Sequence, residues 1–306
     1  MEHIYDMLIV GGGPGGYTAA LYAARAGLDV LVLEKLSAGG QMALTAQIEN
    51  YPGVAGVADG YELGENMRRS AEQFGAKTLL AEVTRLELEG DVKTAYSSEG
   101  TFYGRTLVFA TGANPRKLGL DREYPLTGRG VHYCASCDGM FYRGKTVVVA
   151  GGGNTAAAEA LHLSRVAKKV ILVHRRDTLR ATKIYHQSLM EAENVEFYWD
   201  SAVTGLLGED RLTGLEITDL KTGERRMLDC DGLFVSIGRV PATELVRGQL
   251  ELDEQGYVLA DETTRTNLAG VYAVGDVRTK ALRQIVTATA DGATAAHFAA
   301  EWLAVG

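Results

Sequence analysis

The sequence contains few cysteines, few prolines and no excess of positive charge. Among its 306 residues there are only three Cys, five Pro and two Trp. Three cysteines exclude the disulfide framework of a small secreted domain, and we expect a cytoplasmic protein. The 39 acidic residues outnumber the 31 basic ones, so the formal charge of −8 disfavours general binding to nucleic acid or to anionic membranes.

No apolar run has the composition of a membrane span or of a signal peptide. The uncharged run at residues 7–24 holds five Gly and one Pro in its first ten residues, and no Lys or Arg precedes it. We therefore expect no membrane partner. Hydrophobic residues make up 46% and charged residues 23%, which is typical of a globular protein. At ~100–200 residues per domain, the length favours about two domains.

Glycine is abundant, with 37 copies, and two clusters of it follow apolar segments. Each cluster is typical of a strand, a tight turn and a helix in a parallel α/β unit. The first unit comprises a strand at 5–10, the run Gly11 to Gly16, a helix at 17–26 and a strand at 30–33. The second comprises a strand at 146–150, the run Gly151 to Gly153, a helix at 155–164 and a strand at 170–173. The repeat indicates two nucleotide-binding modules built alike.

A second repeat sets the expected domain boundaries. The apolar segments 107–112 and 233–238 each end in Gly and are followed by Pro three residues later. A further Gly-ended segment, 270–275, has no counterpart in the second module, and we assign it to the first. The predicted fold is α/β, with two Rossmann-like nucleotide-binding domains, the second inserted in the first. The predicted boundaries are 1–114 and 242–306 for the first domain and 115–241 for the second.

The first glycine run has the spacing of a dinucleotide-binding turn, Gly11-x-Gly13-x-x-Gly16. The first Gly permits a tight turn, the second lets the backbone approach a pyrophosphate, and the third lets the helix pack on the strand. The helix N-terminus adds N–H groups and a partial positive charge. Glu34 ends the next strand, where a carboxylate can bind ribose hydroxyls. A plain tight turn is the alternative, and it explains the glycines but not the acid in register.

The second run, Gly151-x-Gly153-x-x-Ala156, has the same spacing but a different residue after its second strand. His174 stands where an acid would be expected. The basic residues that follow it are Arg175, Arg176 and Arg180. A cationic cluster at this edge would bind a 2′-phosphate, so NADP is favoured over NAD. The alternative is a solvated basic surface, because two lysines precede the same strand.

A close pair of cysteines, Cys134-Ala-Ser-Cys137, is followed directly by Asp138. Two intervening residues are the spacing of a reversible disulfide at the start of a helix, where a thiolate is favoured. Asp138 is placed to move thiol protons or, alternatively, to cap the helix. Zinc binding is a competing interpretation in which His132 supplies a third ligand, but the chain has no second Cys-x-x-Cys pair. An inert buried pair is a further alternative, and we expect Cys230 to be a small core residue.

The chain resembles the low-molecular-weight, bacterial-type thioredoxin reductases over nearly its whole length. The matching runs, in order, are Gly11 to Ala20 (GGGPGGYTAA), Gly39 to Gln41, Glu49 to Gly53 (ENYPG), Ala110 to Gly112, Cys134 to Gly139 (CASCDG), Gly151 to Ala156 (GGGNTA), His174 to Asp177 with Arg180, Gly275 with Asp276, and Arg283 with Gln284. The Cys pair between the two glycine turns is the discriminating feature, because related flavin reductases lack it there.

The resemblance implies an FAD domain made of two pieces and an inserted NADPH domain. FAD would lie on the first glycine turn, with Glu34 at the adenosine ribose, and NADPH on the second, with the three arginines at its 2′-phosphate. The residues implied to hold FAD are Gly11, Gly13, Pro14, Gly15, Gly16, Glu34, Gly40, Gln41, Asn50, Thr111, Gly112, Gly275, Asp276, Arg283 and Gln284. Those implied to hold NADPH are Gly151, Gly153, Asn154, Thr155, Ala156, His174, Arg175, Arg176 and Arg180.

The resemblance also implies a reaction and a partner. Cys134 would attack the disulfide of thioredoxin, Cys137 would lie nearer the flavin, and Asp138 would be the acid–base, in a homodimer formed through the FAD domains. Two alternatives stay open. One is a flavin-dependent disulfide reductase with another donor, such as ferredoxin, or another small redox-protein acceptor; the other is a non-catalytic flavoprotein that binds partners. The arginines and the second glycine turn favour NADPH as the donor.

Overall fold

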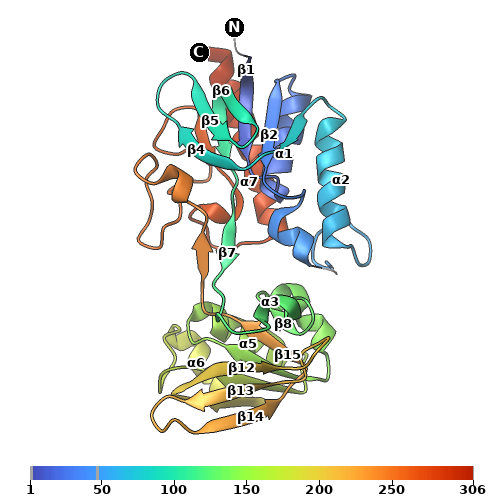
Figure 1. The fold of residues 1–306 in the computed structure, drawn as a ribbon, viewed down its shortest axis with the longest axis vertical. Helices are drawn as coiled ribbons and strands as arrows, with labels where there is room; N and C mark the ends of the chain where they lie inside the picture. Colours follow the sequence, from blue (N-terminus) through green and yellow to red (C-terminus); the bar gives the residue numbers. More distant parts are fainter. Residues whose placement is uncertain (1–2, 46–47, 306) are drawn as a thin grey trace. The chain divides into compact units, whose positions relative to one another are not determined.

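The computed structural model describes residues 3–45 and 48–305, which form two compact units (Figure 1). Unit 1 comprises Met1–Asn114 and Val240–Gly306, and unit 2 comprises Pro115–Arg239. The chain passes between the units twice, at β7 (Ala113–Pro115) and β16 (Arg239–Pro241), which form a two-stranded sheet. Unit 2 is therefore an insertion in the sequence of unit 1.

A seven-stranded sheet forms the centre of unit 1, in the order β3-β2-β1-β6-β5-β4 with β17 also paired to β6. The strands are β1 (Ile4–Val10), β2 (Val30–Glu34), β3 (Lys77–Leu80), β4 (Val83–Glu87), β5 (Lys93–Ser97), β6 (Gly100–Phe109) and β17 (Val271–Ala273). All pairs are parallel except those of β4 with β5 and of β5 with β6. The pairing of β17 with β6 confirms that the segment near residue 270 returns to the first module.

Helices cover one face of this sheet, and strands and loops cover the other. The helices of unit 1 are α1 (Pro14–Arg25), α2 (Gly60–Glu72) and α7 (Ile285–Val305), with 3-10 helices η1 (Gly40–Leu44), η3 (Glu244–Val246) and η4 (Gly275–Val277). Met7 and Ile9 pack among alanines of α1 and α7, whereas Leu8 and Val10 pack with Leu86 of β4. Because both faces of β1 are buried at residues 7–10, this part of the strand is a continuous apolar run, which made it recognisable in the sequence.

Helices α1 and α7 of unit 1 meet at small residues. Helix α7 lies against α1 (Figure 1), and a Cβ added to Gly292 would clash with the carbonyl oxygen of Gly15. Helix α1 begins at Pro14, three residues before the predicted start, because Pro is pre-organised for a first helical position. In the described part of the chain, no helix is both long and apolar enough to cross a membrane.

Unit 2 repeats the plan with five parallel strands in the order β11-β10-β9-β15-β8. The strands are β8 (Val131–His132), β9 (Thr146–Ala150), β10 (Lys169–Val173), β11 (Val195–Tyr198) and β15 (Gly232–Val235). The helices are α3 (Glu123–Leu126), α4 (Ala135–Asp138), α5 (Asn154–Ser164), α6 (Lys183–Met190) and the 3-10 helix η2 (Gly139–Tyr142). Alternate residues of β9 face α5 and α6 on one side. On the other side they face an antiparallel sheet of β12 (Ser201–Leu207), β13 (Gly214–Asp219) and β14 (Arg225–Asp229).

Candidate functional site

The first glycine turn joins β1 to α1, and its glycines meet different surroundings. Gly11 has a φ of +108°, and a Cβ there would clash with the carbonyl oxygen of Ala110, just after β6. A Cβ on Gly16 would clash with the carbonyl oxygen of Gly11, but among the described residues nothing lies within 4 Å of a Cβ on Gly13. The turn is therefore closed at its first and third glycines and open at the second, where the backbone can meet a pyrophosphate.

Glu34 lies beside this turn. Its Oε2 accepts a hydrogen bond from the N–H of Gly12 at 2.6 Å, and its Oε1 accepts one from the N–H of Leu36 at 3.0 Å. Gly40 lies against the open part of the turn, since a Cβ on it would be 3.5 Å from the Cα of Gly13. No side chain among the described residues caps α1, which leaves its first N–H groups for an anion. The arrangement fits the adenosine and pyrophosphate parts of FAD.

The second glycine turn, between β9 and α5, has the same geometry. Gly151 has a φ of +150°, and a Cβ there would clash with the carbonyl oxygen of Ser236, just after β15. Within the described residues nothing lies within 4 Å of a Cβ on Gly153. His174 is buried beside Gly152, and its Nε2 has no hydrogen-bond partner in the described part of the chain. A buried, unpartnered nitrogen beside an open glycine turn fits a bound phosphate.

Three exposed arginines, Arg175, Arg176 and Arg180, follow His174 in the sequence. Burial of the ring, together with the positive charges of Arg180, Arg175 and Arg176, lowers the pKa of His174. The N–H of Arg180 donates to the carbonyl oxygen of Gly152 at 2.7 Å, so the segment that carries the cluster is tied to the glycine turn. The sequence predicts that this cluster binds a nucleotide 2′-phosphate.

Residues implied to line the flavin pocket are joined in pairs across unit 1. Nε2 of Gln41 donates a hydrogen bond to Oδ1 of Asn114 in β7 at 2.9 Å. Nδ2 of Asn50 donates one to Oε1 of Gln284 at 3.1 Å. Oγ1 of Thr111 donates to the carbonyl oxygen of Ala242 at 2.8 Å. The fold thus brings together residues from both sequence pieces of unit 1, as a two-piece FAD domain requires.

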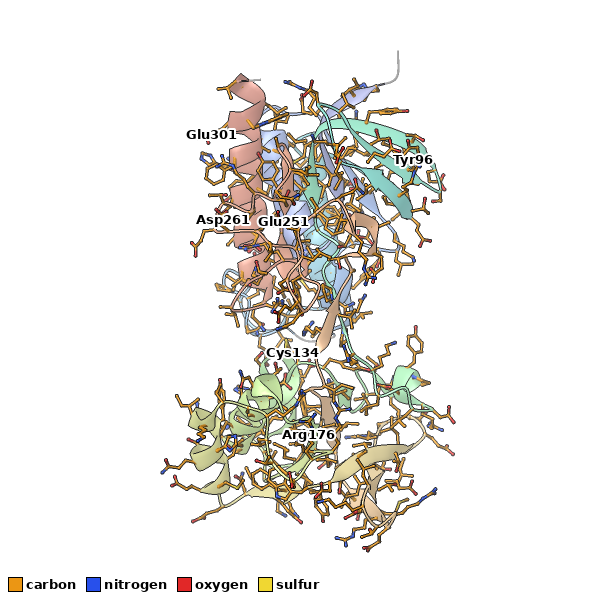
Figure 2. The ribbon with its side chains drawn as sticks, turned by 90° about the vertical axis from the view of Figure 1, so that its left-hand side faces the viewer. Tyr96, Cys134, Arg176, Glu251, Asp261 and Glu301 are labelled. Carbon is orange, nitrogen blue, oxygen red and sulfur yellow. A yellow bond between two sulfur atoms is a disulfide. The ribbon has the colours of Figure 1, made fainter. Side chains whose placement is uncertain are left out.

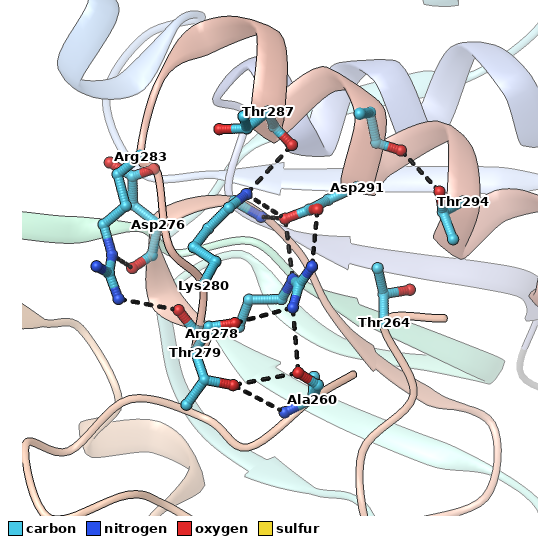
Figure 3. A network of polar contacts seen from close by, with 12 residues as sticks. Ala260, Thr264, Asp276, Arg278, Thr279, Lys280, Arg283, Thr287, Asp291 and Thr294 are labelled. Carbon is cyan, nitrogen blue, oxygen red and sulfur yellow. Dashed lines mark hydrogen bonds and ion pairs between the residues drawn. The ribbon is translucent and has the colours of Figure 1, made fainter. Parts of the chain in front are cut away.

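A buried ion cluster holds the turn Gly275–Asp276 (Figure 3). The carboxylate of Asp291 in α7 accepts a hydrogen bond from the N–H of Gly275 at 2.9 Å. It also accepts hydrogen bonds from Nε of Arg278 at 3.0 Å and from Nζ of Lys280 at 2.6 Å. Nε of Arg283 donates a hydrogen bond to the backbone carbonyl oxygen of Asp276 at 3.3 Å. Burial lowers the pKa of Lys280, and the charge of Asp291 opposes that change. The cluster fixes the backbone that carries the acid implied to bind the ribityl chain.

The cysteine pair lies at the start of a one-turn helix in unit 2. Cys134 and Cys137 form a disulfide with their Cα atoms 5.3 Å apart, and Cys134 is the N-cap of α4, as predicted. Cys134 and Arg176 both belong to unit 2 (Figure 2). Both sulfur-bearing residues are half-buried, whereas Cys230 is buried, and burial raises the pKa of its thiol to about 12. Cys230 is therefore a core residue, as the sequence predicted, and its protonated thiol is unreactive.

Asp138 does not cap a helix with its side chain, so that interpretation of the sequence is wrong. Its Oδ2 lies 3.0 Å from Nδ1 of His132, and Nε2 of His132 lies 2.7 Å from the hydroxyl of Tyr142. In the sequence, His132 has only a possible role as a zinc ligand, and nothing distinguishes Tyr142. The available signal was a polar ring on a buried strand two residues before the Cys pair. In the described residues, no group of three or more His, Cys, Asp or Glu could hold a metal ion.

Glu159 of α5 is a further residue that the sequence did not single out. Its Oε1 accepts a hydrogen bond from the N–H of Ala135 at 3.1 Å, and its Oε2 accepts one from the hydroxyl of Ser236. One carboxyl group therefore links the cysteine helix to the end of β15. Burial raises the pKa of Glu159, while its two hydrogen bonds oppose that shift.

Glu159→Gln is expected to stabilise the protein more at neutral pH than at acid pH. The pKa of Glu159 is higher in the folded than in the unfolded protein, so the folded state favours the protonated carboxyl group. The stability that this group contributes to folding is complete below the unfolded pKa and is lost as the pH rises through the folded pKa. Gln keeps an acceptor for Ala135 and a donor for Ser236 but does not titrate. The stability difference should grow by up to about 1.4 kcal/mol per pH unit across this window. Thermal unfolding as a function of pH measures it, with the exposed Glu262→Gln as control; a pH-independent difference would contradict the prediction.

Known proteins resemble this chain over its full length. Residues 5–292 match the family described as pyridine nucleotide-disulphide oxidoreductase. A thioredoxin reductase of Streptomyces clavuligerus is 47% identical over 99% of this chain and 95% of that protein. One of Treponema pallidum is 44% identical over 99% of this chain and 98% of its own. The solved structure of the thioredoxin reductase from Streptococcus pyogenes MGAS5005 gives a TM-score of 0.93 at 41% identity and covers 100% of both chains.

Proposed function

The chain belongs to the pyridine nucleotide-disulphide oxidoreductase family, and we propose from this premise that it is an NADPH-dependent thioredoxin reductase. Its cofactors are FAD and NADPH, and its substrate is the disulfide of thioredoxin. The observation that carries the proposal is the Cys134–Cys137 disulfide, held in the same unit as a glycine turn followed by an arginine cluster. A dinucleotide site and a half-buried disulfide in one module are the parts that a disulfide reductase needs.

We propose that unit 1 holds FAD and unit 2 holds NADPH. The residues at the ends of β2 in unit 1 and of β10 in unit 2 support this division. Glu34 offers a carboxylate for ribose hydroxyls, whereas His174 and the arginines after it offer positive charge for a 2′-phosphate. The pyrophosphates would meet the open glycines, Gly13 and Gly153, and the first N–H groups of α1 and α5.

When bound, FAD would supply a two-electron relay between the hydride of NADPH and the Cys134–Cys137 disulfide. The remaining chemistry belongs to the chain's own residues. The thiolate of Cys134 attacks one sulfur of thioredoxin and forms a mixed disulfide, which Cys137 then resolves. Asp138, next to Cys137, moves the thiol protons.

Oligomeric state and location are also part of the proposal. We propose a cytoplasmic homodimer formed through unit 1, with neither nucleic acid nor membrane as a partner. The net charge of −8 supports the absence of a polyanionic partner. Light scattering of the purified protein measures the assembly, and a monomeric mass would contradict a homodimer.

A titration of the purified protein tests the proposed function. We expect a visible flavin spectrum that NADPH bleaches at a much lower concentration than NADH, and recovery of the spectrum when oxidised thioredoxin is added. A colourless protein that FAD cannot reconstitute would refute the proposal. Bleaching by reduced ferredoxin but not by NADPH would favour the alternative donor, and recovery only with another small redox protein would favour the alternative acceptor.

A further inference from the structure

His132 has no role in the proposed reaction, but it contacts the side chain of Asp138, the proposed acid–base residue. His132 is on β8, two residues before the Cys pair, and is 9% exposed. Its Nδ1 lies 3.0 Å from Oδ2 of Asp138, and its Nε2 lies 2.7 Å from the hydroxyl of Tyr142. The three side chains form one line of hydrogen bonds that ends at the residue next to Cys137.

The direction of these hydrogen bonds follows from the chemistry of the three groups. An ionised carboxylate only accepts, so Nδ1 of His132 carries the hydrogen that it shares with Asp138. In the neutral ring Nε2 is then an acceptor, and Tyr142 donates to it. Burial and the charge of Asp138 raise the pKa of Tyr142 to about 12, so this hydroxyl keeps its proton throughout the neutral range.

The same arrangement lets the ring take up a second proton without losing either contact. A protonated Nε2 donates to the oxygen of Tyr142, because a hydroxyl can rotate to accept as well as to donate. Nδ1 still donates to Asp138, and that hydrogen bond becomes charge-assisted. The ring also stacks on Phe234, with centroids 5.4 Å apart, which holds it in one orientation. Imidazole is the side chain that ordinarily changes charge between pH 5 and 8.

Other titratable and charged groups face this line of residues from the surrounding elements. They are Lys145, Glu159, His162, Arg211, Cys230 and Asp231. Both ring nitrogens of His132 are occupied by Asp138 and Tyr142, so these groups act on the imidazole through space.

We propose that His132 is a positioning residue for Asp138 that also holds the proton moved during thiol–disulfide exchange; this inference rests on the proposed function. The Asp138–His132 pair takes the proton of Cys134, whose thiolate bonds to one partner sulfur while the partner S–S bond breaks. The departing partner thiolate receives that proton. Cys137 then gives its proton to the pair, its thiolate bonds to the sulfur of Cys134, and the second partner thiolate leaves and is protonated. Two electrons and two protons have then passed to the partner.

Disulfides with different leaving groups separate this role from a structural one. Hydroxyethyl disulfide releases a basic alkyl thiolate that needs a proton, whereas dithiobis(nitrobenzoate) releases an acidic aryl thiolate that does not. The variant His132→Asn keeps an N–H donor toward Asp138 but cannot take up a proton. In the pre-reduced, full-length protein we expect His132→Asn to lower the rate of alkyl disulfide reduction by about 10-fold. The rate of aryl disulfide reduction should change by less than about twofold.

The pH profile and a double variant give independent readouts. We expect His132→Asn to flatten the pH profile of alkyl disulfide reduction between about pH 6 and 8. Tyr142→Phe should keep that profile but move it to lower pH, because the protonated ring loses the stronger hydrogen bond. The pH profile of Tyr142→Phe also tests the inference if His132→Asn does not fold.

A double variant gives a second readout. Adding His132→Asn to Asp138→Asn should not slow alkyl disulfide reduction further, because the two residues act as one unit. The exposed His297→Asn on α7 is the matched control.

Equal slowing of both disulfides by His132→Asn would reduce His132 to a structural role and overturn the inference. An unchanged pH profile in that variant would do the same, as would a full additional loss in the double variant. The wild-type reaction with thioredoxin is measured in parallel. If the wild-type protein exchanges with the small disulfides but not with thioredoxin, the proposed function fails, and the assignment of His132 is still decided by the small disulfides.

Discussion

The variant Cys137→Ser is expected to reduce steady-state thioredoxin reduction by about a thousandfold while NADPH still bleaches the flavin. The variant lacks the sulfur that resolves the mixed disulfide, and no other thiol can replace it. Cys230 is the only other cysteine. It is buried, and its thiol, with a pKa raised to about 12, is almost wholly protonated at neutral pH. Stopped-flow absorbance measures flavin bleaching, and a coupled assay measures thioredoxin reduction.

The same variant also separates the roles of the two cysteines. Because Cys137→Ser keeps Cys134, it should trap thioredoxin in a mixed disulfide that a non-reducing gel detects, whereas Cys134→Ser should trap none. The reverse pattern would exchange the two assignments. Cys230→Ser is the matched control, and it should keep its activity. Full thioredoxin reduction by Cys137→Ser would refute the proposed electron path.

The double variant Arg175→Ala/Arg176→Ala is expected to raise the KM for NADPH about 100-fold and to leave the KM for NADH nearly unchanged. Each arginine would donate charge-assisted hydrogen bonds to a 2′-phosphate, and losing such a bond costs ~1.5–3 kcal/mol. Both side chains are exposed in the absence of nucleotide, so their removal should cost little stability. Initial rates with each nucleotide at several ionic strengths measure the effect.

A matched arginine in the same unit distinguishes specific phosphate binding from general attraction. Arg225 on β14 is exposed and lies 3.8 Å from Glu216, far in sequence from the glycine turn. Arg225→Ala should leave both KM values unchanged. Equal losses for NADPH and NADH in the double variant would show that the arginines bind a part common to both nucleotides, and a change limited to stability would exclude any role in binding.

Features with a local physical cause could be predicted from the sequence. A left-handed backbone at Gly11 and close packing at Gly16 require glycine itself, so the turn is visible in the spacing. The central strands are buried on both faces and therefore appear as apolar runs. Each cofactor contact assigned to the residues around the turns stays a prediction until ligand binding is measured.

Features that depend on distant residues could not be predicted. Glu159 lies 77 positions before Ser236 in the sequence, and nothing local distinguishes it from a solvated acid on a helix. Asp291 belongs to α7, yet it accepts hydrogen bonds from the N–H of Gly275 and from two cationic side chains at residues 278 and 280, all of which precede that helix. A buried polar group needs partners wherever the fold can supply them, and the sequence does not record which partners become neighbours.

By itself, the sequence determined the two glycine turns, the basic cluster after the second one and the position of the cysteine pair at a helix start. These depend on backbone conformation and on side chains a few residues apart, so spacing alone carries the information. Only the tertiary structure decided the hydrogen-bond partners of the cysteine helix: His132, which links Asp138 to Tyr142, and Glu159, which accepts from the N–H of Ala135. Strand pairing and helix packing bring those groups together, and burial then sets their hydrogen bonds and charge.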